Sequence, residues 1–290
     1  MSGVRTGRLF LPALSKDTAK MLMTRDAVEP PPDWEDKWEN ANQVWMSRRP
    51  SAPPEIEDFG ADQSDHIERL QQFPVFQRLY GGRKWSVRLI EISKIRSLVW
   101  WINTGYAENS TGEVENEDNS RLLQLCLPTD LPRRPVEIGL TKESPPGFLM
   151  VTDDLNLTVV EAGVESTSDQ EMQVVFKIGR NAVFMEVVSL GGHYLLKDGH
   201  HRAYGLMARG IKRVPCILVE GEDLSRIEHQ NRPYALSPET FLGDKAPVVA
   251  DLFDPDLTLN VKLRGMIRLL RFRTEEVIIP TSVPLVEQTV

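Results

Sequence analysis

Cysteine is scarce in this chain, because Cys126 and Cys216 are the only two among 290 residues. Two cysteines exclude a disulfide framework and a zinc site built from several thiolates. Both lie within apolar runs, so we expect buried thiols in the reduced state. Long apolar runs are also missing. None approaches the ~18 residues of a membrane-spanning helix, and the run near Leu9 is too short for a secretory signal. The sequence therefore predicts a cytoplasmic protein without membrane contact.

Positive charge is in deficit. The chain has 34 Lys and Arg residues against 42 Asp and Glu residues, which gives a formal net charge of -8 at pH 7. This deficit argues against nucleic-acid binding over the whole surface, although a local basic groove stays compatible with it. The sequence contains no internal repeats, Walker-type phosphate loop, dinucleotide-binding glycine loop or serine elbow. With 41% hydrophobic residues the chain has globular composition, and its length suits one or two domains.

The segment from residue 195 to residue 221 carries the most informative pattern. An apolar run gives way to a short polar turn, a helix follows to about Gly210, and a second apolar run begins at Val214. The polar turn consists of Asp198, Gly199, His200, His201 and Arg202. The first backbone N–H groups of a helix have no partner within it, and the helix dipole favours negative charge there. A strand-to-helix junction with His and Arg is therefore a candidate site for phosphate or carboxylate.

A structural role is the alternative for this polar turn. Asp198 would then cap the helix, Gly199 would supply a positive φ, and the His-His-Arg run would be solvated surface. Adjacent residues on a helix point about 100° apart, so His200 and His201 do not form a metal-binding pair. We therefore expect no metal site from this turn alone.

The polar turn, the short helix and the Val-Pro step after it are together similar to the second motif of the ParB/sulfiredoxin superfamily. That superfamily includes ParB partition proteins, ParB-like nucleases, sulfiredoxins and an ADP-dependent free-serine kinase. The segment Val87–Arg96 resembles the first strand of the same fold. The similarity covers residues 85–97 and 172–222, which is well under half of the chain.

The resemblance implies a nucleotide site, because the loop and helix N-terminus of this motif bind nucleotide phosphates in the superfamily. It implies ligand-binding roles for Gly199, His201 and Arg202. The identity of the ligand stays open, with a nucleoside di- or triphosphate and Mg²⁺ as one candidate. His200 stands where sulfiredoxins have their reactive cysteine, which excludes sulfinic-acid repair by that chemistry. The Gly-Glu-Arg-Arg version of the motif and the downstream helix-turn-helix of partition proteins are both missing.

Each polar residue around the turn has an expected role. Arg202 would grip a phosphate through its planar fork and His201 would donate to a neighbouring oxygen, while N–H groups near Gly199 complete the cradle. Asp198 or Glu186 would bind Mg²⁺ or activate a hydroxyl. The candidate catalytic residues are Asp198, His200 and Glu186. Phosphotransfer or hydrolysis is left open, and the alternative function is a non-enzymatic structural, assembly or partner-binding protein that keeps the fold.

We expect an α+β fold, in which a mixed β-sheet with packed helices carries an N-terminal helical extension and a C-terminal β extension. The core would span residues 64–225, with a long insertion at about residues 103–171, and the extensions would be 1–63 and 226–290. One sheet should combine the strands near 87–95, 172–178, 185–190, 193–197 and 214–219. The helix at 200–209 should pack on that sheet.

The N-terminal extension is acidic and rich in tryptophan. Trp34, Trp38 and Trp45 recur at spacings of four and seven residues, on one face of a helix that Asp33 would cap. This helix would dock on its own chain or on another subunit. We favour its own chain, because apolar stripes on helices most often face their own core.

Three further segments have local signals. Residues 64–80 predict one or two short helices broken near Phe73–Pro74, with His66 on the surface. Residues 103–120 predict a polar loop. Residues 122–127 predict a short buried strand.

The C-terminal extension combines a strand pattern with positive charge. Apolar side chains alternate from Leu257 to Leu263, as on a strand. The segment predicts a basic β-hairpin that carries Lys262, Arg264, Arg268, Arg271 and Arg273. Its cations would form a solvated strand face, or they would contact phosphates or the acidic N-terminal segment. A homo-oligomer or a larger assembly is therefore an open expectation, and nucleic acid is the least favoured partner.

Overall fold

The computed structural model describes residues 4–59, 63–112, 114, 119–130, 137–140, 147–152, 157–168, 171–180, 184–221, 223–227, 234–264 and 268–272. The chain forms two compact units, each described below by itself. Residues 1–132 and 182–265 make up the first unit, and residues 133–181 and 266–290 make up the second. The three-part division at residues 63 and 225 stays a prediction, although parts of both expected extensions belong to the same compact unit as the polar turn.

A six-stranded mixed sheet belongs to the first unit, in the order β2-β3-β12-β10-β11-β4. Its strands are β2 (Ile56–Asp58), β3 (Lys84–Glu91), β4 (Arg96–Ser97), β10 (Glu186–Leu190), β11 (His193–Asp198) and β12 (Arg213–Glu220). Parallel pairing joins β10 to β12 and β11 to β4, and the other neighbours are antiparallel. Four of the five strands predicted for one sheet lie here. The expected mixed sheet and α+β class are confirmed.

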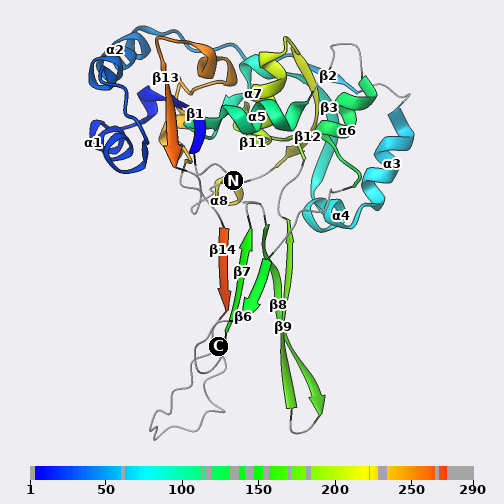
Figure 1. Ribbon diagram of the computed structural model, residues 1–290. Coiled ribbons are helices and arrows are strands. Elements are labelled where there is room, and N and C mark those ends of the chain that lie inside the picture. The colour runs from blue at the N-terminus through cyan, green and yellow to red at the C-terminus, as the bar shows by residue number, and fades with distance from the viewer. Residues whose placement is uncertain are drawn as a thin grey trace, which may run out of the picture. The chain divides into compact units, whose positions relative to one another are not determined.

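The helices of the first unit are α1 (Lys16–Met21), α2 (Trp34–Ser47), α3 (Ser64–Gln72), α4 (Pro74–Tyr80), α5 (Thr104–Thr111), α6 (Asn119–Cys126), α7 (His200–Ala208), α8 (Leu224–Ile227) and α9 (Pro238–Leu242). Shorter helical turns are η1 (Leu11–Ala13), η2 (Leu22–Asp26), η4 (Ile92–Lys94) and η5 (Val249–Phe253). The predicted break between α3 and α4 is confirmed. Helices α5 and α7 lie side by side (Figure 1). Their contact requires Gly205, because a Cβ there would come within 2.5 Å of the Ala107 carbonyl oxygen.

The tryptophan helix α2 packs on its own chain, as predicted. Trp38 Nε1 donates a hydrogen bond to the Leu14 carbonyl at 2.9 Å. The Trp45 ring meets Phe10 edge-to-face, with 5.0 Å between ring centroids. Asp33 occupies the position just before the helix, but its side chain makes no capping hydrogen bond. The tryptophan stripe thus attaches the acidic segment to the core of the first unit.

A second sheet of the first unit joins segments from both ends of the chain. Its order is β13 (Thr258–Arg264), β1 (Val4–Phe10) and β5 (Trp101–Asn103). Lys262 lies beside the acidic segment, because its Nζ is 3.8 Å from Glu29 Oε2 and its carbonyl accepts the Val28 N–H at 2.8 Å. The prediction that the acidic and basic segments meet is confirmed at Lys262, within one chain.

The predicted basic β-hairpin at the C-terminus is wrong. Strand β13 pairs with β1, whereas β14 (Arg268–Phe272) belongs to the second unit and pairs with β7 (Phe148–Thr152). Leu259 and Leu263 of β13 are buried, so the strand is part of a core rather than a solvated hairpin. Alternation located the strand, but it did not identify the partner, because pairing depends on residues far away in the sequence. Arg273 lies outside the described residues.

Two predictions between residues 103 and 127 are also wrong. The expected polar loop contains α5, which begins where the Asn103 side chain accepts the Tyr106 N–H at 2.9 Å. The expected buried strand is helix α6, whose buried residues are Leu122, Leu123 and Cys126. Their spacing places them on one helical face, and a short apolar run does not distinguish a buried helix from a strand.

The second unit consists of β-strands in the part of it that the structure describes. Strands β14, β7 and β6 (Glu137–Leu140) form one antiparallel sheet, and β8 (Leu157–Ser168) pairs with β9 (Glu171–Arg180) in another. The prediction that residues 172–178 join the six-stranded sheet is therefore wrong. The partner strand is instead the one next to it in the sequence, and pairing of such close neighbours needs little loop-closure entropy.

No helix in the described parts of either unit is long and apolar enough to cross a membrane.

Candidate functional site

The polar turn connects the β10–β11 hairpin to helix α7. Glu186, the first residue of β10, pairs with Asp198, the last residue of β11. Gly199 precedes the helix with a φ of 93°, a conformation that L-residues other than glycine rarely adopt. A Cβ on Gly199 would also come within 2.7 Å of the Met185 sulfur. The turn therefore needs glycine both for its backbone angle and for its packing.

Glu186 is a buried carboxylate held by three side chains. Its Oε1 lies 3.2 Å from Arg83 Nη2 and 3.1 Å from Lys197 Nζ. Its Oε2 accepts a hydrogen bond from the Tyr80 hydroxyl at 3.0 Å. Burial, followed by the negative charge of Glu186, raises the pKa of Tyr80 well above its ordinary value, so the phenol keeps its proton. The cations and the phenol together compensate a carboxylate that would be costly to bury alone.

Arg202 connects the turn to helix α6. Its Nη1 donates to the Leu125 carbonyl at 3.0 Å and to the Cys126 carbonyl at 3.4 Å. Its Nη2 lies 3.6 Å from Asp198 Oδ1. A guanidinium at this position satisfies carbonyls that have no partner within α6, and it complements the negative end of that helix.

Burial raises the pKa of the Cys126 thiol to about 12, and both cysteines of the chain are buried and free, as predicted.

His200 is buried and contacts a different part of the chain. Its Nε2 accepts the backbone N–H of Leu98 at 3.3 Å. We infer that Nδ1 carries the proton and that the ring is neutral, because a nitrogen that accepts must keep its lone pair. The lone pair of Nε2 is engaged by this hydrogen bond, and a general base would need it, so His200 does not fit the role of a general base through Nε2.

The prediction that His66 lies on the surface is wrong. This residue is also buried, and its Nε2 lies 2.8 Å from the Leu127 carbonyl oxygen.

His201 lies among aromatic side chains. Its ring meets Tyr106 of α5 edge-to-face at 5.3 Å and Trp101 of β5 at 6.0 Å, measured between ring centroids. Trp101 in turn packs against Tyr234 at 4.7 Å and lies 5.2 Å from the Arg5 guanidinium. The two histidines and the arginine of the polar turn therefore contact three different parts of the fold.

The structure gathers part of the predicted site into one group, which we call the junction cluster. It consists of Tyr80, Arg83, Glu186, Lys197, Asp198 and Arg202. Within the described residues it holds three cations and two carboxylates, and the cationic side chains keep 14–15% of their surface exposed. His200 and His201 make their contacts elsewhere, and Gly199 shapes the turn.

Three members of the junction cluster were not predicted from the sequence. Tyr80 is the last residue of α4 and Arg83 lies in the turn before β3, and they precede Glu186 by 106 and 103 residues. No local pattern connects positions so far apart. Lys197 did carry a signal, because it interrupts an apolar run directly before the turn, and a lysine in a largely buried strand requires a partner.

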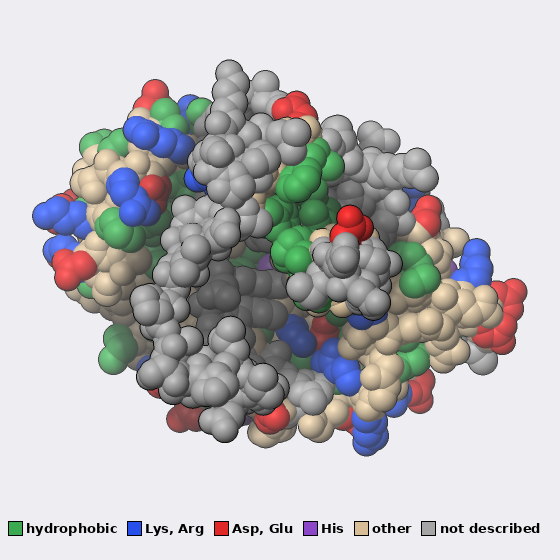
Figure 2. All heavy atoms as spheres, turned by 90° about the horizontal axis from the view of Figure 1, so that it is seen from below, with side chains coloured by type: hydrophobic (Ala, Val, Ile, Leu, Met, Phe, Trp, Pro, Cys, Tyr) green, Lys and Arg blue, Asp and Glu red, His purple; other side chains and the backbone are tan. Residues whose placement is uncertain are grey.

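Figure 2 shows Lys and Arg side chains interspersed with Asp and Glu side chains over the described part of the face in view. Among the described residues, no three His, Cys, Asp or Glu side chains are close enough together to hold a metal ion. Comparison of the chain with protein-family models, with curated proteins and with solved structures gives no match.

Proposed function

We propose that the junction cluster binds a nucleotide or another phosphate ligand at the N-terminus of α7. The observation that carries this proposal is that Arg83, Lys197 and Arg202 come from three segments, gather at one helix end and stay partly accessible. Partial burial lowers the effective dielectric constant, which strengthens the attraction between these cations and an anion. The positive end of the α7 dipole acts in the same direction.

Lys197 is the cation best suited to contact the ligand. Its ammonium group has three donors, and its contact with Glu186 engages one of them while fixing its position. Glu186 accepts through both oxygens, so its role in this proposal is to orient the cations rather than to activate a hydroxyl. Asp198, which lies next to the helix end, is the carboxylate for a ligand-bound Mg²⁺. The proposal concerns binding, and it includes no turnover.

Isothermal titration calorimetry with ATP, ADP, CTP and GTP, each with and without Mg²⁺, tests the proposal. The wild type should bind at least one nucleotide with a millimolar or smaller dissociation constant. Lys197→Met should weaken that binding about 10- to 100-fold, because a hydrogen bond to a charged group contributes about 1.5–3 kcal/mol. The matched control is Lys84→Met, since Lys84 is 80% exposed and pairs with Glu220 on the neighbouring strand. No binding by the wild type, or equal weakening in both variants, contradicts the proposal.

Partner binding through the second unit is a second candidate function, favoured by its exposed apolar side chains. Val164 of β8 and Val174 of β9 lie directly opposite each other and are 66% and 58% exposed. Phe176 lies on the same face of β9, packs on Phe272 of β14 at 4.7 Å and stays 45% exposed. Exposed apolar faces of this kind mark protein–protein contacts.

Sedimentation velocity over a range of protein concentrations tests this second candidate. If the face joins two copies of the chain, the wild type should associate as concentration rises, and Val174→Lys should prevent association. Gln173→Lys is the matched control, because Gln173 is exposed on the opposite face of the same strand. Identical sedimentation of all three proteins would argue against assembly through this face.

A further inference from the structure

A cleft of about 220 Å³ lies in the first unit at the start of β11, whereas the junction cluster lies at the end of that strand. Its walls come from the proline-rich segment after α2, from η4 and β4, from the β10–β11 turn and from the loop before η5. Pockets for drug-sized ligands measure roughly 300–1,000 Å³. The cleft is therefore suited to a molecule smaller than a nucleotide.

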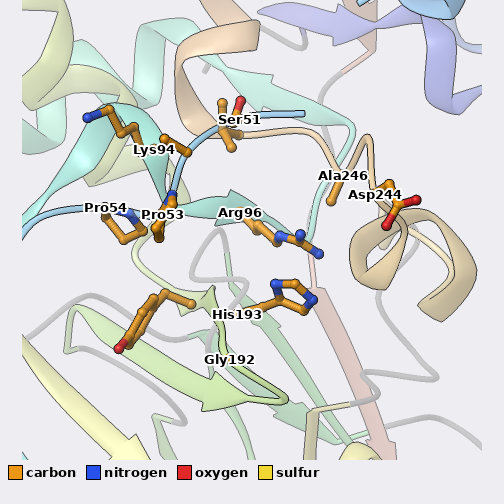
Figure 3. Close-up of a pocket in the computed structure, with 12 residues that line it drawn as sticks. Ser51, Pro53, Pro54, Lys94, Arg96, Gly192, His193, Asp244 and Ala246 are labelled. Carbon is orange, nitrogen blue, oxygen red and sulfur yellow. The ribbon is translucent and has the colours of Figure 1, made fainter. Parts of the chain in front are cut away.

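Two nitrogen-bearing side chains project into the same part of this cleft. Figure 3 shows the Arg96 guanidinium next to the His193 imidazole, with Asp244 beyond them. Strands β4 and β11 bring them together, since Arg96 pairs with Leu195 in parallel register. Arg96 is anchored by a hydrogen bond from Nη1 to the Phe241 carbonyl at 3.0 Å. An anchored guanidinium beside an imidazole matches the oxygens of a phosphate group.

The cleft contains positive charge from Arg96 and Lys94 and negative charge from Asp244. Burial lowers the pKa of Arg96, and Asp244 opposes this effect. Burial and, after it, the positive charge of Arg96 lower the pKa of His193, whereas the negative charge of Asp244 raises it. The net effect is a lowered pKa, so the imidazole is neutral at pH 7. Lys94 also lines the cleft, and its Nζ lies 2.9 Å from Glu91 Oε2. A dianion placed between Arg96 and His193 would offset the cost of burying these two groups. It would also offset the repulsion between Arg96 and a protonated His193.

We propose that this cleft binds inorganic phosphate, or the phosphate group of a small metabolite, between Arg96 and His193, and that His193 takes up one proton from the solvent on binding. The resulting imidazolium donates to one phosphate oxygen, while Arg96 donates to another. Because protonated His193 belongs to the bound state, the affinity rises as the pH falls. The site is separate from the junction cluster and does not depend on it.

Sulfate is the first probe, because it stays a dianion throughout the experiment and any proton uptake then belongs to the protein. Calorimetry at about pH 5.5 and about pH 8 should show binding at least about tenfold tighter at the lower pH, as expected when one proton is linked to binding. His193→Gln should bind weakly and equally at both pH values. Arg96→Gln should lose binding. In Lys197→Met, which weakens the anion site proposed at the junction cluster, the pH-dependent sulfate binding of the cleft should persist.

Two further measurements complete the test. Titration with inorganic phosphate and with glycerol phosphate distinguishes the two ligand sources. If the ligand is a small phosphorylated metabolite, glycerol phosphate should bind more tightly. If the ligand is free phosphate, inorganic phosphate should bind more tightly. If Arg96→Gln does not fold, the NMR titration of the His193 imidazole in the wild type still decides, because sulfate should raise its pKa. Sulfate binding that is independent of pH, undiminished in His193→Gln, or lost in Lys197→Met overturns the proposal.

Discussion

Replacing Glu186 with glutamine would remove one negative charge from a buried cluster while keeping the size of the side chain. Glu186 is 4% exposed, and its oxygens lie 3.2 Å from Arg83, 3.1 Å from Lys197 and 3.0 Å from the Tyr80 hydroxyl. Removing one partner of a buried ion pair costs about 3–5 kcal/mol, because the remaining charge is left uncompensated. The two cations keep 14–15% exposure and are partly solvated, so we expect the lower end, about 3 kcal/mol.

Urea denaturation followed by circular dichroism measures this loss as a fall in the free energy of unfolding. The double variant Glu186→Gln/Lys197→Met should lose less than the sum of the single variants, because both remove the same interaction. Glu220→Gln serves as the control, since Glu220 pairs with Lys84 at the surface and its loss should change the stability little. A loss in Glu186→Gln no larger than in this control would show that the carboxylate does not hold the cluster together.

The remaining predictions concern the turn, the phenol and the thiols. Gly199→Ala should lower the free energy of unfolding in urea by about 2–5 kcal/mol, because a left-handed backbone costs about 1–2 kcal/mol and overpacking against Met185 adds about 1–3 kcal/mol. In the Gly199→Ala background, Met185→Ala should restore only the share of the unfolding free energy that was lost to overpacking, measured against Met185→Ala alone. Burial raises the folded-state pKa of Tyr80, so its contribution to stability is fully present below about pH 10 and is lost as the pH rises through the folded value. Tyr80→Phe should remove this alkaline loss. Burial raises the pKa of both Cys126 and Cys216, so a thiol reagent should modify them only as the chain unfolds, and rapid native labelling would contradict this.

Periodicity in the sequence predicted the elements whose side chains report local burial. The six-stranded sheet contains the β10–β11 hairpin and the run Val214–Val219. It also contains the first part of the alternating segment Val87–Ile95, because β3 ends at Glu91 and η4 follows it. The spacing of Trp34, Trp38 and Trp45 gave both a helix and its docked face. Each of these signals depends on residues within one element.

Partners far apart in the sequence could not be predicted in the same way. The pairing of β1 with β13 joins opposite ends of the chain, and Arg83 reaches Glu186 across 103 residues. Arg202 illustrates the same limit at the site. Its position after a strand–glycine step suggested a phosphate ligand. Its guanidinium also donates to the carbonyls of Leu125 and Cys126 in α6. The local pattern had indicated that segment as a strand, so these partners could not be foreseen. A cation in a turn is recognisable from sequence, but its partner is not.

We propose that the cations gathered at the N-terminus of α7 bind a phosphate ligand. The most direct test compares calorimetric titrations of the wild type, Lys197→Met and Lys84→Met with the nucleotide that the wild type binds best. The claim predicts one saturable site per chain in the wild type, an unchanged site in Lys84→Met, and binding about tenfold or more weaker in Lys197→Met. Identical binding curves for all three proteins, or no heat of binding in the wild type at millimolar nucleotide, would contradict it.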